Sequence, residues 1–241
     1  YDHASTPAVV KLQNGNILVL GGNTQNAEIY DVKQNKFFAT KGKLNYIRSS
    51  GSNAILLKDG AVLITGGANS SPSAEFKGAQ DYIPVSEAEI YDANNDSFSI
   101  ISKMQRSRSS HIAIGLNNGN VLFFGGWNNR DEVKDVEEYD YNLKNFNLIS
   151  ELQFQEQSCM QIIKVNEKEL FFFGNRLHWN LTKNPYFVQR YNFANHDFKN
   201  TEIKYSHCNS AGLMLNNDRI IITGGMEGIT GTSSSDKVTI Y

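Results

Sequence analysis

Short apolar segments alternate with polar turns along the whole chain, and the apolar segments recur at long intervals. An apolar run that ends in Gly-Gly occurs at 17–22, 62–67, 121–126 and 220–225, and a variant copy with a single Gly occurs at 170–174. The last Gly residues of successive copies are 45, 59, 48 and 51 residues apart. Recurrence at such a period indicates a repeat architecture in which each repeat forms one supersecondary unit.

An aromatic pair follows each of the first four runs at a fixed spacing. A Tyr comes after the Gly-Gly segment, and a Phe stands seven residues after that Tyr: Tyr30 and Phe37, Tyr91 and Phe98, Tyr139 and Phe146, Tyr191 and Phe198. The residue after the Tyr is Asp in three repeats and Asn in the fourth. A repeat cannot bury its faces alone, and aromatic side chains bury large areas. We therefore predict that these pairs pack between adjacent repeats.

Each repeat contains four predicted strands and almost no helix signal. An apolar, β-branched segment comes first and leads into a turn pair such as Asn14-Gly15, Asp59-Gly60 or Asn118-Gly119, which suits a tight hairpin. The Gly-Gly strand is second, a third strand ends at the Tyr, and a fourth contains the Phe. A four-stranded sheet repeated at this period is typical of a propeller blade. The predicted fold is thus an all-β propeller of four-stranded antiparallel blades.

These markers together resemble the Kelch repeat, in which Gly-Gly closes the second strand and is followed by Tyr-Asp and a later aromatic residue. The segment 111–126 is the copy most similar to that pattern, and it also resembles the copies found in many bacterial proteins. Kelch repeats usually have Trp where this chain has Phe. The resemblance spans the chain and implies one Kelch propeller domain at 1–241, with blade units at about 1–42, 43–102, 103–150, 151–204 and 205–241.

Counting strands predicts four complete blades and most of a fifth. The chain begins just before a first strand, and Tyr241 lies in a third strand. An open ring would leave strand edges bare. We therefore expect the chain either to belong to a larger ring or to be completed by a strand from upstream of Tyr1.

Almost all length variation lies on one face of the predicted propeller. With strands labelled A to D from the axis outward, the B–C and D–A connections share a face, here called the loop face. The step from the last Gly of each run to the following Tyr, which spans the B–C connection, is 8, 24, 13, 17 and 16 residues. The step from each Phe to the last Gly of the next run is nearly constant, at 30, 28, 28 and 27 residues. Variable loops on a rigid frame commonly carry binding sites, so we expect binding on the loop face.

Candidate binding residues occur in these connections or at the start of an A strand. Arg binds carboxylates with a planar fork, and Trp is enriched at binding hot spots. The candidates are Arg48, Arg108, His111, Trp127, Asn128, Arg130, Arg176 and Trp179. We expect them to bind an acidic protein or peptide partner. An alternative for each Arg is a surface charge or an inter-blade hydrogen bond, and an alternative for His111 is an inter-blade hydrogen bond rather than catalysis.

Motifs for catalysis and metal binding are not found in the sequence. No zinc, phosphate-loop or nucleophile-elbow pattern occurs, and the His residues lack metal-ligand spacing. We therefore assign no catalytic residue, no metal and no cofactor. The acids Glu137 and Glu138 are expected to be solvated strand positions, and Cys159 and Cys208 are expected to be buried thiols.

The charge balance narrows the partner classes. The chain has 25 acidic and 23 basic residues, a net charge of −2, which argues against non-specific binding to nucleic acid or to anionic membranes. No apolar run is long enough to span a bilayer. We favour a binding module. The alternative is a sugar-active protein that takes a small acid sugar, similar to the Kelch mutarotases for sialic acid or the propeller of copper radical oxidases. The cellular compartment is left open.

Overall fold

A computed structural model describes residues 3–49, 51–72, 80–129, 131–152, 161–175, 186–201, 211–215, 219–224, 226–227, 233–234 and 238–240. Every regular element in these ranges is a β-strand, so the all-β prediction is confirmed. The described part contains no helix long and apolar enough to cross a membrane. The chain forms two compact units, Tyr1–Glu151 (unit 1) and Leu152–Tyr241 (unit 2).

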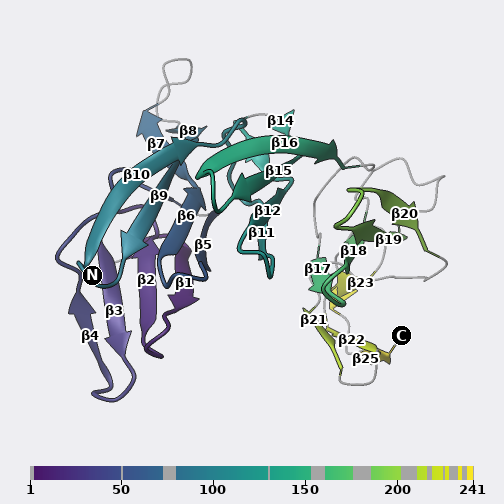
Figure 1. Cartoon of the computed structure of the whole chain (residues 1–241), viewed down its shortest axis with the longest axis horizontal. Coiled ribbons are helices and arrows are strands. Elements are labelled where there is room, and N and C mark those ends of the chain that lie inside the picture. Colours follow the sequence, from purple (N-terminus) through teal and green to yellow (C-terminus); the bar gives the residue numbers. More distant parts are fainter. Residues whose placement is uncertain are drawn as a thin grey trace. The chain divides into compact units, whose positions relative to one another are not determined.

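Unit 1 contains three four-stranded antiparallel sheets that follow one another in sequence (Figure 1). Sheet 1 has the order β1 (Pro7–Lys11), β2 (Ile17–Gly21), β3 (Ala27–Asp31) and β4 (Lys36–Ala39). Sheet 2 has the order β5 (Ser52–Leu56), β6 (Val62–Gly66), β9 (Glu87–Asp92) and β10 (Ser97–Lys103). Sheet 3 has the order β11 (Ile112–Gly115), β12 (Val121–Phe124), β15 (Asp135–Asp140) and β16 (Asn145–Glu151). The Gly-Gly strand is second in each sheet, as the repeat predicts.

Neighbouring sheets of unit 1 pack face to face, with their A strands in contact: β1 against β5, and β5 against β11. Leu18 and Leu20 of sheet 1 pack with Ile64 and Tyr91 of sheet 2. In the same way, Tyr139 and Phe146 of sheet 3 pack with residues in or directly after the strands of sheet 2, namely Leu57, Leu63, Ala88 and Met104. Each of sheets 2 and 3 therefore turns its aromatic pair toward the sheet that precedes it in the sequence.

The Tyr and Phe of each pair lie directly opposite each other on the C and D strands. Their ring centroids are 5.0, 4.8, 5.1 and 4.7 Å apart in sheets 1 to 4. The predicted packing between repeats is confirmed for Tyr91 and Tyr139, which have no exposed surface. It is wrong for Phe37, which is 58% exposed because no described element of unit 1 covers its face of sheet 1.

The Tyr-Asp pair has a local function in the C–D turn. The Asp carboxylate accepts backbone N–H hydrogen bonds from the turn, as Asp31 does from Lys33 and Gln34 and Asp140 does from Asn142. Side-chain acceptors of this kind stabilise tight turns. The same turn places a residue with positive φ five positions after each Tyr, at Asn35, Asp96, Lys144 and His196. The motif thus fixes both the chain reversal and the place of the next strand.

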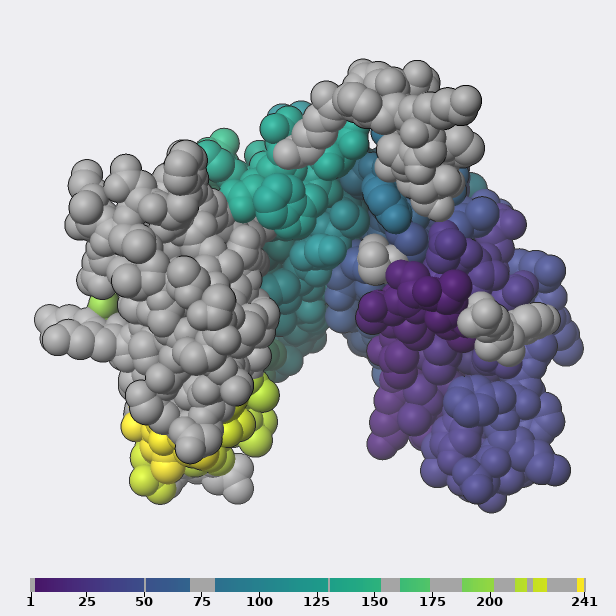
Figure 2. Space-filling view, turned by 180° about the vertical axis from the view of Figure 1, so that it is seen from behind, coloured from purple at the N-terminus to yellow at the C-terminus, as the bar shows by residue number. Residues whose placement is uncertain are grey.

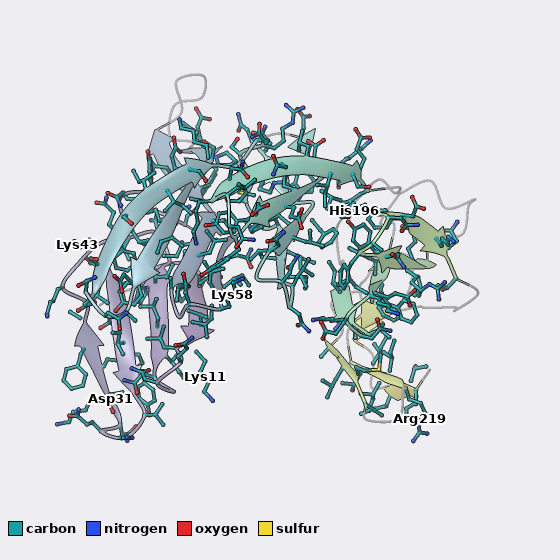
Figure 3. The ribbon with its side chains drawn as sticks, in the orientation of Figure 1. Lys11, Asp31, Lys43, Lys58, His196 and Arg219 are labelled. Carbon is teal, nitrogen blue, oxygen red and sulfur yellow. The ribbon has the colours of Figure 1, made fainter. Side chains whose placement is uncertain are left out.

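The Tyr hydroxyl reaches this left-handed residue. The hydroxyl of Tyr91 donates to Oδ1 of Asp96 at 2.8 Å, and the hydroxyl of Tyr191 lies 2.8 Å from Nδ1 of His196, which is labelled in Figure 3. In sheet 3 the left-handed residue is Lys144, and the buried hydroxyl of Tyr139 has no hydrogen-bond partner among the described residues.

Unit 2 contains two further sheets of the same design. Sheet 4 has the order β17 (Gln161–Lys164), β18 (Glu169–Asn175), β19 (Tyr186–Asn192) and β20 (Phe198–Asn200). Sheet 5 has three described strands, β21 (Ala211–Met214), β22 (Ile220–Thr223) and β25 (Val238–Ile240). Phe173 and Val188 of sheet 4 pack with Ile220 and Ile222 of sheet 5. Four four-stranded sheets and part of a fifth match the predicted blade count.

Three B–C connections form β-hairpins of their own. These are β7 (Ala68–Pro72) with β8 (Gln80–Pro84), β13 (Trp127–Asn128) with β14 (Asp131–Glu132), and β23 (Met226–Glu227) with β24 (Ser233–Ser234). In unit 1, β7, β8 and β14 lie at the end of the sheets opposite the β1–β2 and β11–β12 turns (Figure 1). The long insertions between the Gly-Gly strand and the Tyr therefore lie on the loop face.

Replacing Phe146 by Ala should lower the free energy of unfolding by about 3–5 kcal/mol, because a 2% exposed ring in the sheet 2–sheet 3 cluster leaves a cavity when removed. Leu143→Ala, at a 69% exposed turn position, is the control and should change it by less than about 0.5 kcal/mol. Denaturant titration measures both; equal losses would contradict the packing described.

Tyr91→Phe and Tyr139→Phe should differ, although the two Tyr residues occupy equivalent positions. Tyr91→Phe removes a hydrogen bond to Asp96 and should cost about 1 kcal/mol, whereas Tyr139→Phe removes a buried unpaired hydroxyl and should be neutral or stabilising. Thermal unfolding of the two variants compares them. A larger loss for Tyr139→Phe would show that its hydroxyl has a stabilising partner.

Candidate functional site

Three recurring residues meet where each sheet of unit 1 reaches the loop face. They are the first Gly of the Gly-Gly pair, an acid two residues before the Tyr, and a cationic or His side chain from the D–A connection. The side-chain pairs are His3 with Glu28, Arg48 with Glu89, and Arg108 with Glu137. We call each such arrangement a brace.

The brace of sheet 2 is completely buried. Nε and Nη2 of Arg48 donate to Oε1 of Glu89 at 3.1 and 2.9 Å, and neither side chain has exposed surface. Nη1 of Arg48 donates to the carbonyl of Gly66 at 2.5 Å, and Nη2 donates to the carbonyl of Glu87 at 2.7 Å. Oε2 of Glu89 accepts from both the backbone and side-chain nitrogens of Asn45, at 2.6 and 2.8 Å. One ion pair thus joins the B strand, the C strand and the D–A connection.

The brace of sheet 3 repeats this geometry. Nη2 of Arg108 donates to Glu137, and Nη1 donates to the carbonyls of Gly125 and Asp135 at 3.0 and 2.9 Å. The Glu137 carboxylate also accepts from the backbone nitrogens of Gln105 and Arg106 at 2.8 and 3.0 Å. Burial lowers the pKa of the Arg108 guanidinium, and Glu137 opposes that shift. Arginine stays charged in proteins, so the brace is a charged pair.

Sheet 1 has a weaker version in which His3 takes the place of Arg. Nε2 of His3 lies 3.3 Å from Oε2 of Glu28, and Nδ1 lies 2.6 Å from the carbonyl of Gly21. Here the two side chains keep 12% and 14% of their surface exposed. The carbonyl of the first Gly accepts a hydrogen bond from the D–A connection in all three sheets.

Close approach of backbones explains the Gly at these positions. Gly66 has φ +64°, and a Cβ there would lie 2.6 Å from the carbonyl oxygen of Arg108 and 2.4 Å from the His111 ring. A side chain would therefore push sheet 2 away from the start of sheet 3. Gly-Gly is thus a contact between consecutive repeats.

These contacts revise the role expected for Arg48 and Arg108. Both guanidinium groups have no exposed surface and donate to groups inside the unit, so they cannot grip the carboxylate of a surface partner. Neither Arg is a surface charge or makes an inter-blade hydrogen bond, because each bonds to the acid and to backbone carbonyls of its own blade. The expectation that Glu137 is solvated is wrong, because Arg108 compensates its burial. Glu89 was not singled out from the sequence, although Glu stands two residues before the Tyr in three repeats.

His111 also belongs to an interface between sheets. It is 4% exposed, its Nε2 lies 3.0 Å from Oγ1 of Thr65, and its carbonyl accepts from Nδ2 of Asn53 at 2.7 Å. Burial, with the Arg108 and Arg48 charges, lowers the pKa of His111 to about 3. The ring is therefore neutral at physiological pH and connects sheet 3 to sheet 2. Among the described residues, no group of three or more His, Cys, Asp or Glu is placed to hold a metal ion.

Exposed apolar side chains occur instead on the two hairpins of unit 1, although Tyr82 and Ile83 are consecutive in β8 and therefore lie on opposite faces of that hairpin. Tyr82 and Ile83 of β8 are 55% and 56% exposed, and Trp127 of β13 is 40% exposed. Strands β8 and β13 contact each other, so the three side chains come from neighbouring elements. We call Tyr82, Ile83 and Trp127 the hairpin patch. Of the residues predicted from sequence, it contains Trp127.

The patch rests on a fixed backbone. The backbone N–H of Trp127 donates to Ser109 and that of Ser109 donates to Trp127, both at 2.9 Å. Ser109 follows Arg108, so the sheet 3 brace holds the segment that positions Trp127. Oδ1 of the exposed Asn128 accepts from the Ser107 hydroxyl at 3.2 Å. Arg130, Arg176 and Trp179 lie outside the described residues, as do Cys159 and Cys208.

Two clefts open at the opposite end of unit 1. A cleft of about 410 Å³ lies between sheets 1 and 2, and its lining includes Gln13, Asp59 and Asp92. A second of about 260 Å³ lies between sheets 2 and 3, beside Lys58 and Leu116. Both are lined largely by turn residues, and neither lining includes a residue of the hairpin patch.

Comparison with known proteins defines the fold. No protein-family model matches the sequence, and no curated protein matches it. The solved structure of YjhT is similar over 98% of this chain and 82% of its own, with a TM-score of 0.70 and 13% sequence identity. At that identity the likeness shows the fold, which is a β-propeller of four-stranded antiparallel blades.

Arg108→Ala should lower the free energy of unfolding by about 3–5 kcal/mol, because it leaves the Glu137 carboxylate buried without its cation. Arg106→Ala is the matched control two residues away; its pair with Asp135 is 56% exposed on the Arg side and should contribute about 0–1 kcal/mol. Denaturant titration measures both. Similar small losses would show that the sheet 3 pair does not hold the blade.

Acid should destabilise the protein partly through His111. The unfolded chain binds a proton on this residue near pH 6.5, whereas the folded chain does so only near pH 3, so the stabilisation is present above pH 6.5 and is lost as the pH falls toward 3. His111→Gln should therefore lose less stability than the parent between pH 7 and pH 4. Urea titration at both pH values tests this, and equal losses would argue against a neutral buried His111.

Proposed function

We propose that this chain is a Kelch-type propeller that acts as a binding module, with the hairpin patch of the loop face as its contact surface for a protein partner. The supporting observation is that large apolar side chains are exposed on two hairpins that contact each other: Trp127 on β13, and Tyr82 and Ile83 on the two faces of β8. Solvent-exposed apolar groups that gather on one surface mark interaction sites more often than scattered ones do. Kelch membership rests on the repeat markers and the propeller fold together.

The composition of the patch favours a macromolecular partner with apolar or aromatic side chains. Tyr and Trp give large contact areas at low entropic cost, and they are enriched at hot spots. Because two hydrogen bonds to Ser109 hold the backbone of Trp127, little backbone ordering is required when a partner binds. A polar neighbour, Asn128, can supply orientation at the edge.

Acidic groups of the partner would contribute less than its apolar groups, by contacting exposed cations around the hairpin patch. Lys103 and Arg106 are 70% and 56% exposed and pair at the surface with Glu87 and Asp135. Such exposed pairs are weak and can exchange partners at low cost. Rim charges chiefly affect association rate and salt dependence. We therefore expect Lys103 and Arg106, rather than the buried Arg48 and Arg108, to contact acidic groups of the partner.

The sugar-active alternative drew on Arg108 and His111. Both side chains are engaged inside unit 1, with Glu137 and with Thr65 respectively. No observation in the described residues favours this alternative over binding.

Photo-crosslinking tests the proposal. A benzoylphenylalanine at position 83 should form a crosslink to a partner in native extract, and the same group at Leu143, which is 69% exposed at a C–D turn, should not. Trp127→Ala should weaken capture of that partner at least ~10-fold, the effect of a hot-spot side chain. Crosslinking at 143 but not at 83, or capture unchanged by Trp127→Ala, would overturn the proposal.

A further inference from the structure

The larger cleft of unit 1 lies between sheets 1 and 2, and turns of both sheets form its walls. We call it the turn cleft. Its volume of about 410 Å³ is in the range of small-molecule sites, which is roughly 300–1,000 Å³. Figure 2 shows the first repeat, in purple, against the second, in blue. Both walls belong to unit 1, so the cleft is a feature of that unit alone.

The turn cleft is negatively charged. Among the described residues that line it, the ionisable ones are both acids, Asp59 from the A–B turn of sheet 2 and Asp92 from its C–D turn. The adjacent cation Lys58, labelled in Figure 3, is engaged on the side of sheet 3 instead. Its Nζ donates to the carbonyl of Asn118 at 3.0 Å and lies 4.2 Å from the centroid of the Tyr141 ring. The Tyr141 hydroxyl also forms a hydrogen bond with Asp59.

Both carboxylates are held in place by their own turns. Oδ1 of Asp59 accepts from the backbone nitrogen of Ala61 at 3.1 Å, and Oδ1 of Asp92 accepts from that of Asn94 at 2.8 Å. Oδ2 of Asp92 also accepts from the side chain of Asn95. The bond from Asn94 lowers the pKa of Asp92, so this group is ionised at physiological pH. A carboxylate offers about four acceptor sites, so both groups can accept further hydrogen bonds.

The turns themselves do not require these negative charges. Oδ1 of Asn118, at the Asp59 position of sheet 3, accepts from the backbone nitrogen two residues later at 2.9 Å. Oδ1 of Asn192, at the Asp92 position of sheet 4, makes the same bond at 2.8 Å. The neutral amide therefore forms the same turn as the acid. The charges of Asp59 and Asp92 are available to attract a cation into the cleft.

The rest of the lining is aliphatic or carries side-chain amides. The aliphatic members come from both sheets and are Leu12, Ala61, Ile90 and Ala93. Such side chains favour contact with methylene groups, because both are then removed from water. A ligand that suits the whole lining therefore combines positive charge with a short hydrocarbon chain.

We propose that the turn cleft binds an aliphatic polyamine, with one ammonium group at Asp59, a second at Asp92, and the methylene chain against Leu12 and Ile90. Hydrogen bonds between ammonium groups and carboxylates are charge-assisted and are stronger than neutral ones. The lining of the cleft includes no residue of the hairpin patch, so this site is independent of the proposed function.

Calorimetric titration with spermidine at low salt tests the proposal. Asp59→Asn and Asp92→Asn should each weaken binding about 2–5-fold, the effect of losing one partly exposed ion pair. The double variant should weaken it further. Because Asn forms the same turns elsewhere in this chain, these variants should keep the melting temperature of the parent.

Asp140→Asn is the matched control. Asp140 is the equivalent of Asp92 in the C–D turn of sheet 3, and it does not line the turn cleft. Its replacement removes the same charge from the protein and should leave the affinity for spermidine unchanged. An equal loss for Asp140→Asn would show attraction to the overall charge and would overturn the proposal, as would full affinity in the double variant.

Two further measurements test the place and the chemistry of binding. Spermidine should shift the backbone amide NMR signals of Ala61 and Ala93, and shifts confined to other parts of the chain would overturn the proposal. Butylamine has a single ammonium group and should bind at least ~3-fold more weakly than spermidine, because it can pair with one carboxylate only. Equal affinities for the two amines would contradict the use of both acids.

Discussion

A carboxylate cannot remain buried without a compensating charge, and this constraint organises the loop-face end of unit 1. Glu89 and Glu137 have no exposed surface, so each requires the guanidinium that the D–A connection brings to it. The remaining Arg donors go to carbonyls of the Gly-Gly strand and of the C strand. Such a pair contributes little net stability compared with an apolar core, but breaking it is costly. Its effect is to hold three chain segments in one arrangement.

This arrangement separates the frame from the proposed contact surface. The innermost polar residues, Arg48, Arg108 and His111, are used between strands and between sheets. The segment that follows Arg108 forms the backbone bridge to Trp127, so the frame ends where the hairpins begin. Variation in the length of the B–C connections can then change the exposed surface without altering the blades. Tyr82, Ile83 and Trp127 are on such connections.

Much of the fold could be predicted from the sequence, because the repeat markers act locally. The Asp or Asn after each Tyr caps its own turn, and the Tyr lies opposite the Phe seven residues later because the C–D turn has constant length. The candidate site was harder to predict, because burial of a charge depends on a distant partner. Glu89 pairs with a residue 41 positions away and Glu137 with one 29 away, so each reads as an exposed strand position when considered alone. Phe37 shows the same limit for apolar residues, since it is 58% exposed although it stands at the same spacing from its Tyr as the buried Phe146.

The pairing of Arg48 with Glu89 is the central claim of this account, and a double-mutant cycle tests it most directly. Arg48→Met, Glu89→Met and the double variant would each be titrated with denaturant. If the two side chains compensate each other in the interior, the double variant should lose less stability than the sum of the single losses, with a coupling free energy of about 1–3 kcal/mol. Losses that add to within about 0.5 kcal/mol would contradict the claim that this ion pair holds the loop-face end of the blade.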